Sequence, residues 1–175
     1  MIYIVRHGET EWNANNKVLG RTDIPLNSNG KKQARELACS LTDLKIDVFL
    51  CSPLSRARQT ADIISEAIGL EYKIDDRLIE QDFGEFEGIN RFTDEYQQAK
   101  REYFVRYPGG ESYFDMAARV FPLIEELSEV NALLVTHGGI CRIVRSYFED
   151  LGNEDFVRFS QGNCEMRAYP LSGEE

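Results

Sequence analysis

The sequence predicts an α/β fold in which a mainly parallel central sheet lies between two helical layers, as a three-layer sandwich. Three short apolar runs of strand length, residues 2–5, 46–50 and 132–135, are bounded by polar residues. Such runs are typical of central strands that are covered on both faces. Longer stretches with helical spacing separate them. This alternation indicates parallel strands that are joined by helical crossovers.

Four stretches between and after these strands have an apolar face with helical periodicity. Their apolar positions are, in chain order, Ala34, Leu37 and Leu41; Ala57, Ala61, Ile64 and Ile68; Ala117, Val120, Ile124 and Leu127; Ile140, Val144, Tyr147 and Leu151. Pro122 lies inside the third stretch, where it predicts a kink or a helix that begins near it. Residues 164–171 are expected to form a last strand.

The length of 175 residues predicts a single domain over residues 1–175. Residues 75–112 are its least regular part, because they are rich in acids, aromatics and turn-forming glycines. We expect this segment to be a cap-like insert over one end of the sheet.

The charge balance excludes several classes of partner. Thirty acidic residues stand against twenty basic ones, a formal net charge of −10. Such a surface repels nucleic acid and anionic lipid, so we expect neither as a partner. No apolar run approaches the ~20 residues that cross a bilayer. The four cysteines form no CxxC pair, which indicates small buried thiols in a reducing cytoplasm rather than zinc or disulfides.

Histidines and arginines follow the three predicted strands at the points where these strands end. The first strand runs into Arg6 and His7, the second is followed by Arg56, and the third runs into His137. Because the carboxyl ends of parallel strands meet at one edge, we expect these side chains to share a site. An arginine fork suits a phosphate, and a neutral imidazole can act as a nucleophile. The pattern therefore predicts phosphoryl chemistry.

Three other phosphate chemistries fit the sequence poorly. A Walker loop is absent, since Gly30-Lys31-Lys32 lacks both the first glycine and the hydroxyl residue. A Cys-x5-Arg phosphatase is absent, since no cysteine has an arginine six positions later. A binuclear metal site would need more than the two histidines present. We therefore expect neither a metal nor a cofactor.

The strand ends belong to longer sequence blocks that run through most of the chain. In chain order these are residues 5–13 (VRHGETEWN), 20–26 (GRTDIPL), 52–61 (SPLSRARQTA), 78–80 (LIE), 84–88 (GEFEG), 108–112 (PGGES) and 135–139 (VTHGG). Together they resemble the histidine phosphatase superfamily, in its phosphoglycerate mutase-like branch. The resemblance implies the phosphoglycerate mutase-like form of the α/β sandwich.

The resemblance also implies roles for individual residues in a two-step transfer through a phosphohistidine on His7. Arg6, Arg56 and His137 would hold the equatorial oxygens of the phosphoryl group. Glu80 would protonate the leaving oxygen and then activate the water that hydrolyses the phosphohistidine. Further contacts to phosphate or substrate are expected from Asn13, Gly20, Arg21, Arg91 and Gly138.

For several arginines, the sequence allows a role other than substrate binding. Arg21 lies in a loop where it could reach the substrate or point into solvent. Arg91 resembles a position where mutases keep a basic group for the substrate carboxylate, and a surface arginine would give the same sequence. Arg142 and Arg145 are three apart after His137, and we interpret them as part of a solvated helix face.

Departures from the mutase pattern favour a phosphatase, which lets water reach the phosphohistidine. In this family, mutases have longer chains, with a larger insert after the glutamate and a C-terminal tail that closes the site. Here only residues 89–107 separate Gly88 from Pro108, and the chain ends soon after the last strand. Mutases also carry Gly-Trp-Tyr-Asp in place of residues 20–23 and Asn in place of Gly139. The segment at residues 20–26 is most similar to small phosphatases such as the α-ribazole phosphatases of cobalamin assembly.

We therefore expect a cytoplasmic phosphatase that hydrolyses a small phosphorylated metabolite. Mutase-type phosphoryl transfer is the first alternative. A non-catalytic phosphate-binding module is the second, and the intact set of His7, Glu80 and His137 argues against it. The sequence leaves the substrate and the oligomeric state open, with a homodimer as one of the options.

Overall fold

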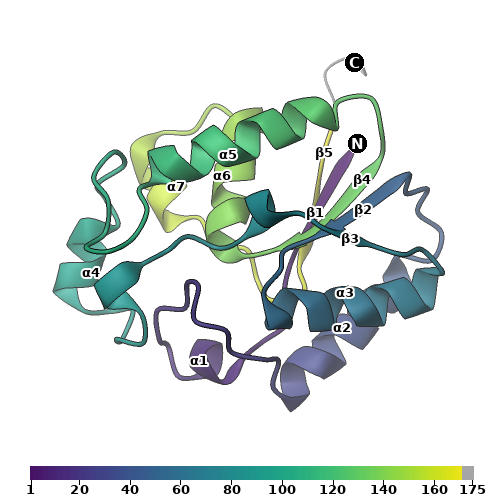
Figure 1. Ribbon diagram of the computed structural model, residues 1–175, viewed down its shortest axis with the longest axis horizontal. Helices are drawn as coiled ribbons and strands as arrows, with labels where there is room; N and C mark the ends of the chain where they lie inside the picture. The colour runs from purple at the N-terminus through teal and green to yellow at the C-terminus, as the bar shows by residue number, and fades with distance from the viewer. Residues whose placement is uncertain (171–175) are drawn as a thin grey trace.

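The computed structural model describes residues 1–170, which form a five-stranded sheet between helices on both faces (Figure 1). The strands are β1 (Ile2–Arg6), β2 (Val48–Cys51), β3 (Lys73–Ile74), β4 (Ala132–Thr136) and β5 (Met166–Tyr169). Their order in the sheet is β3-β2-β4-β1-β5, and only β5 runs antiparallel to its neighbour. The predicted α/β sandwich with a mainly parallel sheet is confirmed.

Four long helices cover the two faces of the sheet. They are α2 (Ser28–Ser40) and α3 (Ser55–Ile68) on one face, and α5 (Tyr113–Glu126) and α6 (Gly138–Phe148) on the other (Figure 1). Successive strand residues point to opposite faces, so Leu134 packs toward α5 and α6 while Leu133 and Val135 pack toward α2 and α3. This double burial explains why the central strands are continuous apolar runs.

Shorter elements complete the chain beside the sheet. They are α1 (Glu11–Ala14), α4 (Asp94–Ala99), α7 (Asn153–Arg158) and the 3₁₀ turns η1 (Asp76–Leu78) and η2 (Gly84–Phe86). The segment 75–112 lies on the side of the sheet where the parallel strands end (Figure 1). It has a small aromatic cluster of its own, built on Phe83, Tyr96 and Tyr107. No helix within residues 1–170 is both long and apolar enough to cross a bilayer.

Some sequence expectations differ from the structure in detail. The second strand begins at Val48, two residues later than the start of the expected range 46–50. The edge strand β3 was not predicted, because its two residues are exposed and form no apolar run. Helix α5 begins at the Ser112 N-cap and runs through Pro122, so a helix start near Pro122 is wrong. The last strand covers Met166–Tyr169, and Leu171 lies outside the described residues.

The cysteines correct one further expectation. Cys51 and Cys141 are buried, whereas Cys39 is exposed and Cys164 is partly exposed. The expectation of four buried thiols is therefore wrong for two of them.

The strand register brings the candidate residues together. Arg6 pairs with Thr136 across β1 and β4, and Cys51 pairs with Val135 across β2 and β4. The residues that follow these three strands therefore emerge side by side at one edge of the sheet.

Candidate active site

His7 directly follows β1 and is almost completely buried, with 3% of its surface exposed. Its backbone N–H donates to Thr136 O at 2.9 Å, which fixes the residue at the end of the strand pair. Its Nδ1 lies 2.7 Å from Gly8 O, and because a carbonyl only accepts, Nδ1 must carry the proton. The lone pair is therefore on Nε2, which receives a hydrogen bond from Arg56 Nε at 3.3 Å. His7 is oriented as a nucleophile.

The protonation of both histidines is set by burial and by the nearby arginines. Burial, then Arg56 and Arg6, lower the pKa of His7 well below its usual value. Burial, then Arg56, lower the pKa of His137 in the same direction. A lowered histidine pKa means that the neutral ring persists well below pH 6.5. The ring of His7 is therefore neutral at neutral pH.

His137 is the N-cap residue of α6 and is fully buried. Its ring centroid lies 5.1 Å from that of His7. Its Nε2 lies 2.6 Å from Ser52 Oγ, whereas its Nδ1 is buried and has no hydrogen-bond partner among residues 1–170. Because a serine hydroxyl can donate to Nε2, Nδ1 can carry the proton and offer it to a bound anion.

Arg56 lies in the first turn of α3 and is fully buried. Its Nη1 donates to Thr22 O at 3.1 Å and its Nη2 donates to Gly20 O at 2.6 Å. These carbonyls hold the guanidinium so that Nε points at His7. Gly20 thus contacts Arg56 through its carbonyl, and it must be glycine because a Cβ would lie 2.6 Å from Gln81 O.

Arg6 and Gly138 lie together beside the histidines. Arg6 Nη1 donates to Gln161 O at 2.7 Å, and the Gln161 side chain is in turn anchored by donating to Ile4 O at 3.0 Å. Arg6 Nε has no partner among residues 1–170. A Cβ on Gly138 would lie 3.6 Å from that nitrogen, so the start of α6 lies close to the guanidinium.

Glu80 is 5% exposed and is held by two backbone N–H groups. Its Oε1 accepts from Gln81 N at 2.8 Å, and its Oε2 accepts from Gly139 N at 3.1 Å. The second bond places the carboxyl group at the first turn of α6, next to His137. A Cβ on residue 139 would lie 2.5 Å from Glu80 Oε1, so Gly139 is what allows this position.

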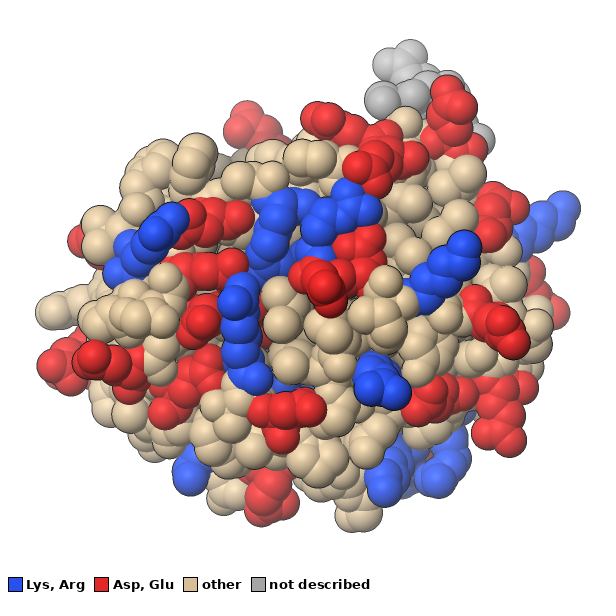
Figure 2. Space-filling model, in the orientation of Figure 1, with Lys and Arg blue, Asp and Glu red and all other residues tan. Residues whose placement is uncertain are grey.

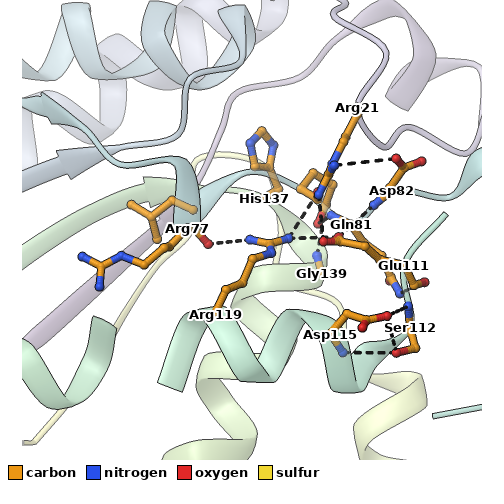
Figure 3. A network of polar contacts seen from close by, with 12 residues as sticks. Arg21, Arg77, Gln81, Asp82, Glu111, Ser112, Asp115, Arg119, His137 and Gly139 are labelled. Carbon is orange, nitrogen blue, oxygen red and sulfur yellow. Dashed lines mark hydrogen bonds and ion pairs between the residues drawn. The ribbon is translucent and has the colours of Figure 1, made fainter. Parts of the chain in front are cut away.

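The backbone oxygen of Glu80 is held by a clamp of three residues, Arg21, Arg119 and Glu111. Figure 3 shows these three side chains meeting one another. Arg21 Nε and Arg119 Nη2 each lie 3.4 Å from Glu80 O. Glu111 joins the two guanidiniums, at 2.8 Å from Arg21 Nη2 and 3.2 Å from Arg119 Nη2. Arg21 is also 3.7 Å from Asp82. The structure therefore places Arg21 in this clamp, bound to Glu80 and Glu111.

Sequence reasoning missed two members of the clamp. Glu111 lies in the PGGES block, which contributes to the resemblance without indicating a role for this residue. Arg119 lies on α5 and has no neighbouring sequence signal. Sequence reasoning also missed Ser52, whose hydroxyl contacts His137, although it opens the SPLSRARQTA block.

Asn13 and Arg91 line a cleft whose wall also includes Arg6, Glu80 and Gly138. Asn13 Oδ1 accepts from the Thr10 backbone N–H and hydroxyl in the capping box of α1, so its amide N–H groups remain for the cleft. Arg91 Nη2 donates to Asn13 O at 3.1 Å. The cleft has a volume of about 400 Å³, which suits a small molecule.

Arg142 corrects the expectation of a solvated helix face. It is only 9% exposed and lines the cleft, whereas Arg145 pairs with Glu149 at 2.7 Å on the outside of α6. Figure 2 shows lysine and arginine side chains gathered near the middle of this face, with acidic side chains around them. The net negative charge of the chain is therefore unevenly distributed.

The chain is similar in sequence and fold to several known proteins. The sequence profile of the histidine phosphatase superfamily (branch 1) matches residues 2–175. The probable phosphoglycerate mutase GpmB of Escherichia fergusonii is 35% identical over 148 residues, which cover 78% of this chain and 69% of that protein. The structure of the mycobacterial glucosyl-3-phosphoglycerate phosphatase Rv2419c matches with a TM-score of 0.83 at 27% identity, over 94% of this chain and 87% of that one. TTHB049 from Thermus thermophilus matches with a TM-score of 0.72 at 37% identity, over 84% of each chain.

Proposed function

Because the chain belongs to the histidine phosphatase superfamily, branch 1, we propose that it hydrolyses small-molecule phosphomonoesters through a phosphohistidine on His7. The observation that carries the proposal is the tautomer of His7. Because Nδ1 donates its proton in a hydrogen bond to Gly8 O, the ring has its lone pair on Nε2. The ring lies near Arg56, Arg6 and His137. A nucleophile surrounded by anion-binding donors supports phosphoryl transfer.

In the first step the Nε2 lone pair attacks phosphorus in line with the ester oxygen. The N–P bond forms while the P–O bond breaks, and Glu80 gives its proton to the leaving alkoxide. In the second step Glu80 takes a proton from water, whose oxygen attacks the phosphohistidine. The N–P bond then breaks, and inorganic phosphate, neutral His7 and protonated Glu80 are restored.

Three donors are placed to neutralise the charge of the phosphoryl group. Arg56 Nε already points at His7, while Arg6 Nε and His137 Nδ1 have no protein partner among residues 1–170. Fixed donors in a buried site stabilise a developing charge without reorganising. This arrangement needs no metal ion, and within residues 1–170 no three His, Cys, Asp or Glu side chains are grouped as metal ligands. We expect full activity after exhaustive chelation.

Hydrolysis rather than mutase transfer is supported by the segment that covers the cleft. A mutase must keep water from the phosphohistidine until the phosphoryl group returns to its acceptor. Between Gly88 and Pro108 the only helix is α4, of six residues, and Phe92 at the cleft is 67% exposed. Such a short, open cover favours attack by water.

An isotope experiment separates the three candidate functions. The protein would be incubated with a panel of phosphomonoesters in [¹⁸O]water, and the released phosphate would be analysed by mass spectrometry. We expect inorganic phosphate that carries one ¹⁸O atom. Movement of the phosphoryl group to another hydroxyl without release would indicate a mutase. Phosphate-competitive binding of substrates without turnover or phosphoenzyme would indicate a binding module.

A further inference from the structure

One face of α3 presents two buried polar side chains to the chain segment that follows β1. The buried residues of this helix are Arg56, Ala57, Thr60, Ala61 and Ile64, of which the first and the third are polar. Arg56 and Thr60 are four positions apart, so they lie on the same face of the helix. Arg56 contacts the ring of His7, and Thr60, which is fully buried, contacts the backbone directly after it. Thr60 thus joins the helix to the residues beside the nucleophile.

The chemistry of the hydroxyl group fixes the direction of both hydrogen bonds of Thr60. Its Oγ1 donates its single proton to Arg56 O at 2.8 Å, because a carbonyl only accepts. A lone pair of the same oxygen therefore accepts from Gly8 N at 3.0 Å. Gly8 is itself buried, so loss of the hydroxyl would leave its N–H without an acceptor in a place that is shielded from solvent.

The same peptide unit is held from its other side by Asn163. The Nδ2 of Asn163 donates to His7 O at 2.9 Å, and this carbonyl shares its peptide unit with the N–H of Gly8. The next peptide unit is held as well, because Glu9 N donates to Gln33 Oε1 at 2.9 Å. Side chains from α3, from α2 and from the loop before β5 therefore hold two successive peptide units.

These two peptide units determine where the ring of His7 points. The second unit carries Gly8 O, which accepts the Nδ1 proton of His7 at 2.7 Å. Residue 8 must be glycine, since a Cβ there would lie 2.5 Å from Gly30 O. Glycine has greater backbone freedom than any other residue. The acceptor of the Nδ1 proton thus belongs to a residue whose rotation must be limited by the side chains around it.

We propose that Thr60 and Asn163 are positioning residues for the nucleophile. They hold the peptide unit between His7 and Gly8, which keeps Gly8 O at the Nδ1 proton and keeps Nε2 aimed at the phosphorus atom. Thr60 is fully buried, so it acts through His7 without touching the substrate. The inference rests on the proposed function for the role of His7, and it adds the residues that orient this ring.

The hydrogen bond between His7 Nδ1 and Gly8 O can be observed directly, because the chain has only two histidines. Imidazole N–H protons would be recorded by NMR in protein with ¹⁵N-labelled histidine, and His7→Asn would assign the His7 signal. Thr60→Val keeps the shape of the side chain and removes its hydroxyl. The Nδ1 proton should then move upfield and exchange with solvent about tenfold faster, the effect of weakening one hydrogen bond. Arg56 still donates to Nε2, so the tautomer should persist.

The kinetic signature is a loss of rate without a loss of binding. In single-turnover experiments, Thr60→Val should slow the formation of the phosphohistidine by about tenfold, because the ring is less often aligned for attack. The dissociation constant for inorganic phosphate should be unchanged, since Arg6, Arg56 and His137 are still present. A general disturbance of the site would weaken phosphate binding and slow the transfer together.

Three further variants locate the effect. Asn163→Ala removes the donor on the other side of the peptide unit and should change the proton signal and the rate in the same direction. Asn163 is partly exposed, so this variant carries the test if Thr60→Val does not fold. Thr60→Ser keeps the hydroxyl and should restore both the signal and the rate. Thr42→Val makes the same chemical change at an exposed position and is the matched control, which should alter neither.

The proposal is overturned if the Nδ1 proton and the transfer rate of either folded variant, Thr60→Val or Asn163→Ala, match those of the wild-type protein. It is also overturned if Thr60→Ser is as slow as Thr60→Val, if rate and phosphate affinity fall together, or if both variants fail to fold. These results would mean that the residues serve packing alone. Failure of the proposed function has a different signature, since the Nδ1 proton would respond as expected while no phosphomonoester formed a phosphoenzyme.

Discussion

The two sides of the cleft are built in different ways. On the sheet side, His7 and Arg56 are each tied to backbone carbonyls, at 2.7 Å from Gly8 O and 2.6 Å from Gly20 O. On the cap side, Lys100 has no partner among the described residues and follows a helix of only six residues. The difference teaches that the sheet side is held in place by backbone hydrogen bonds, whereas the cap side is held less firmly.

Glu80 lies between these two sides and is attached to both. It belongs to the chain segment of the cap, but its carboxyl group accepts from Gly139 N at the end of the sheet. Its backbone is held by Arg21 and Arg119. As the proposed general acid, Glu80 would lie between the phosphoryl group and the leaving group.

The largest effect is expected on the sheet side. His7→Ala should abolish turnover, because it removes the proposed nucleophile. Brief exposure of the wild-type protein to a labelled phosphomonoester should leave acid-labile, base-stable phosphate, and the variant should leave none. Thermal unfolding of the variant would check the fold. Label on a cysteine or serine would contradict the mechanism.

Replacement of the bridging acid should give the next largest effect. In single-turnover experiments, Glu80→Gln should slow transfer from alkyl phosphates by roughly 10²–10⁴-fold, the usual contribution of general acid catalysis. Aryl phosphates with acidic phenols need little proton assistance and should be slowed less. Glutamine keeps the shape of the side chain and removes a negative charge near the phosphate, so binding should change little. Its single carbonyl oxygen can accept from only one of Gln81 N and Gly139 N, because its NH2 group cannot accept a hydrogen bond.

Glu85→Gln provides the matched control for Glu80, because Glu85 is exposed on the neighbouring turn η2. It should leave both leaving-group classes unaffected. Equal losses with alkyl and aryl phosphates in Glu80→Gln would exclude Glu80 as the general acid.

The same division explains what the sequence could predict. The sheet side was predictable because apolar strands end at His7 and His137, and parallel strands bring their ends together. Arg142 was misinterpreted because its spacing to Arg145 resembles a solvated helix face. Its burial comes from Tyr113 and Phe156, which pack near its guanidinium from other elements. No local pattern encodes such contacts.

The clamp behind Glu80 could not be predicted either, since it joins residues from three separate segments. Arg21, Glu111 and Arg119 meet only after the chain has folded, and their contact to Glu80 is made through a backbone oxygen. Because every residue has a backbone oxygen, this contact cannot be inferred from the type of residue at position 80.

A smaller effect is expected from this clamp. Glu111→Gln removes the charge that joins Arg21 to Arg119, which should misplace Glu80 and slow transfer from alkyl phosphates by about tenfold. The loss of rate should be smaller with aryl phosphates. Glu111→Gln should therefore show the same dependence on the leaving group as Glu80→Gln, with smaller losses. A purely structural role would slow both classes equally. Glu126→Gln, which breaks a surface pair with Arg77, is the control and should change neither.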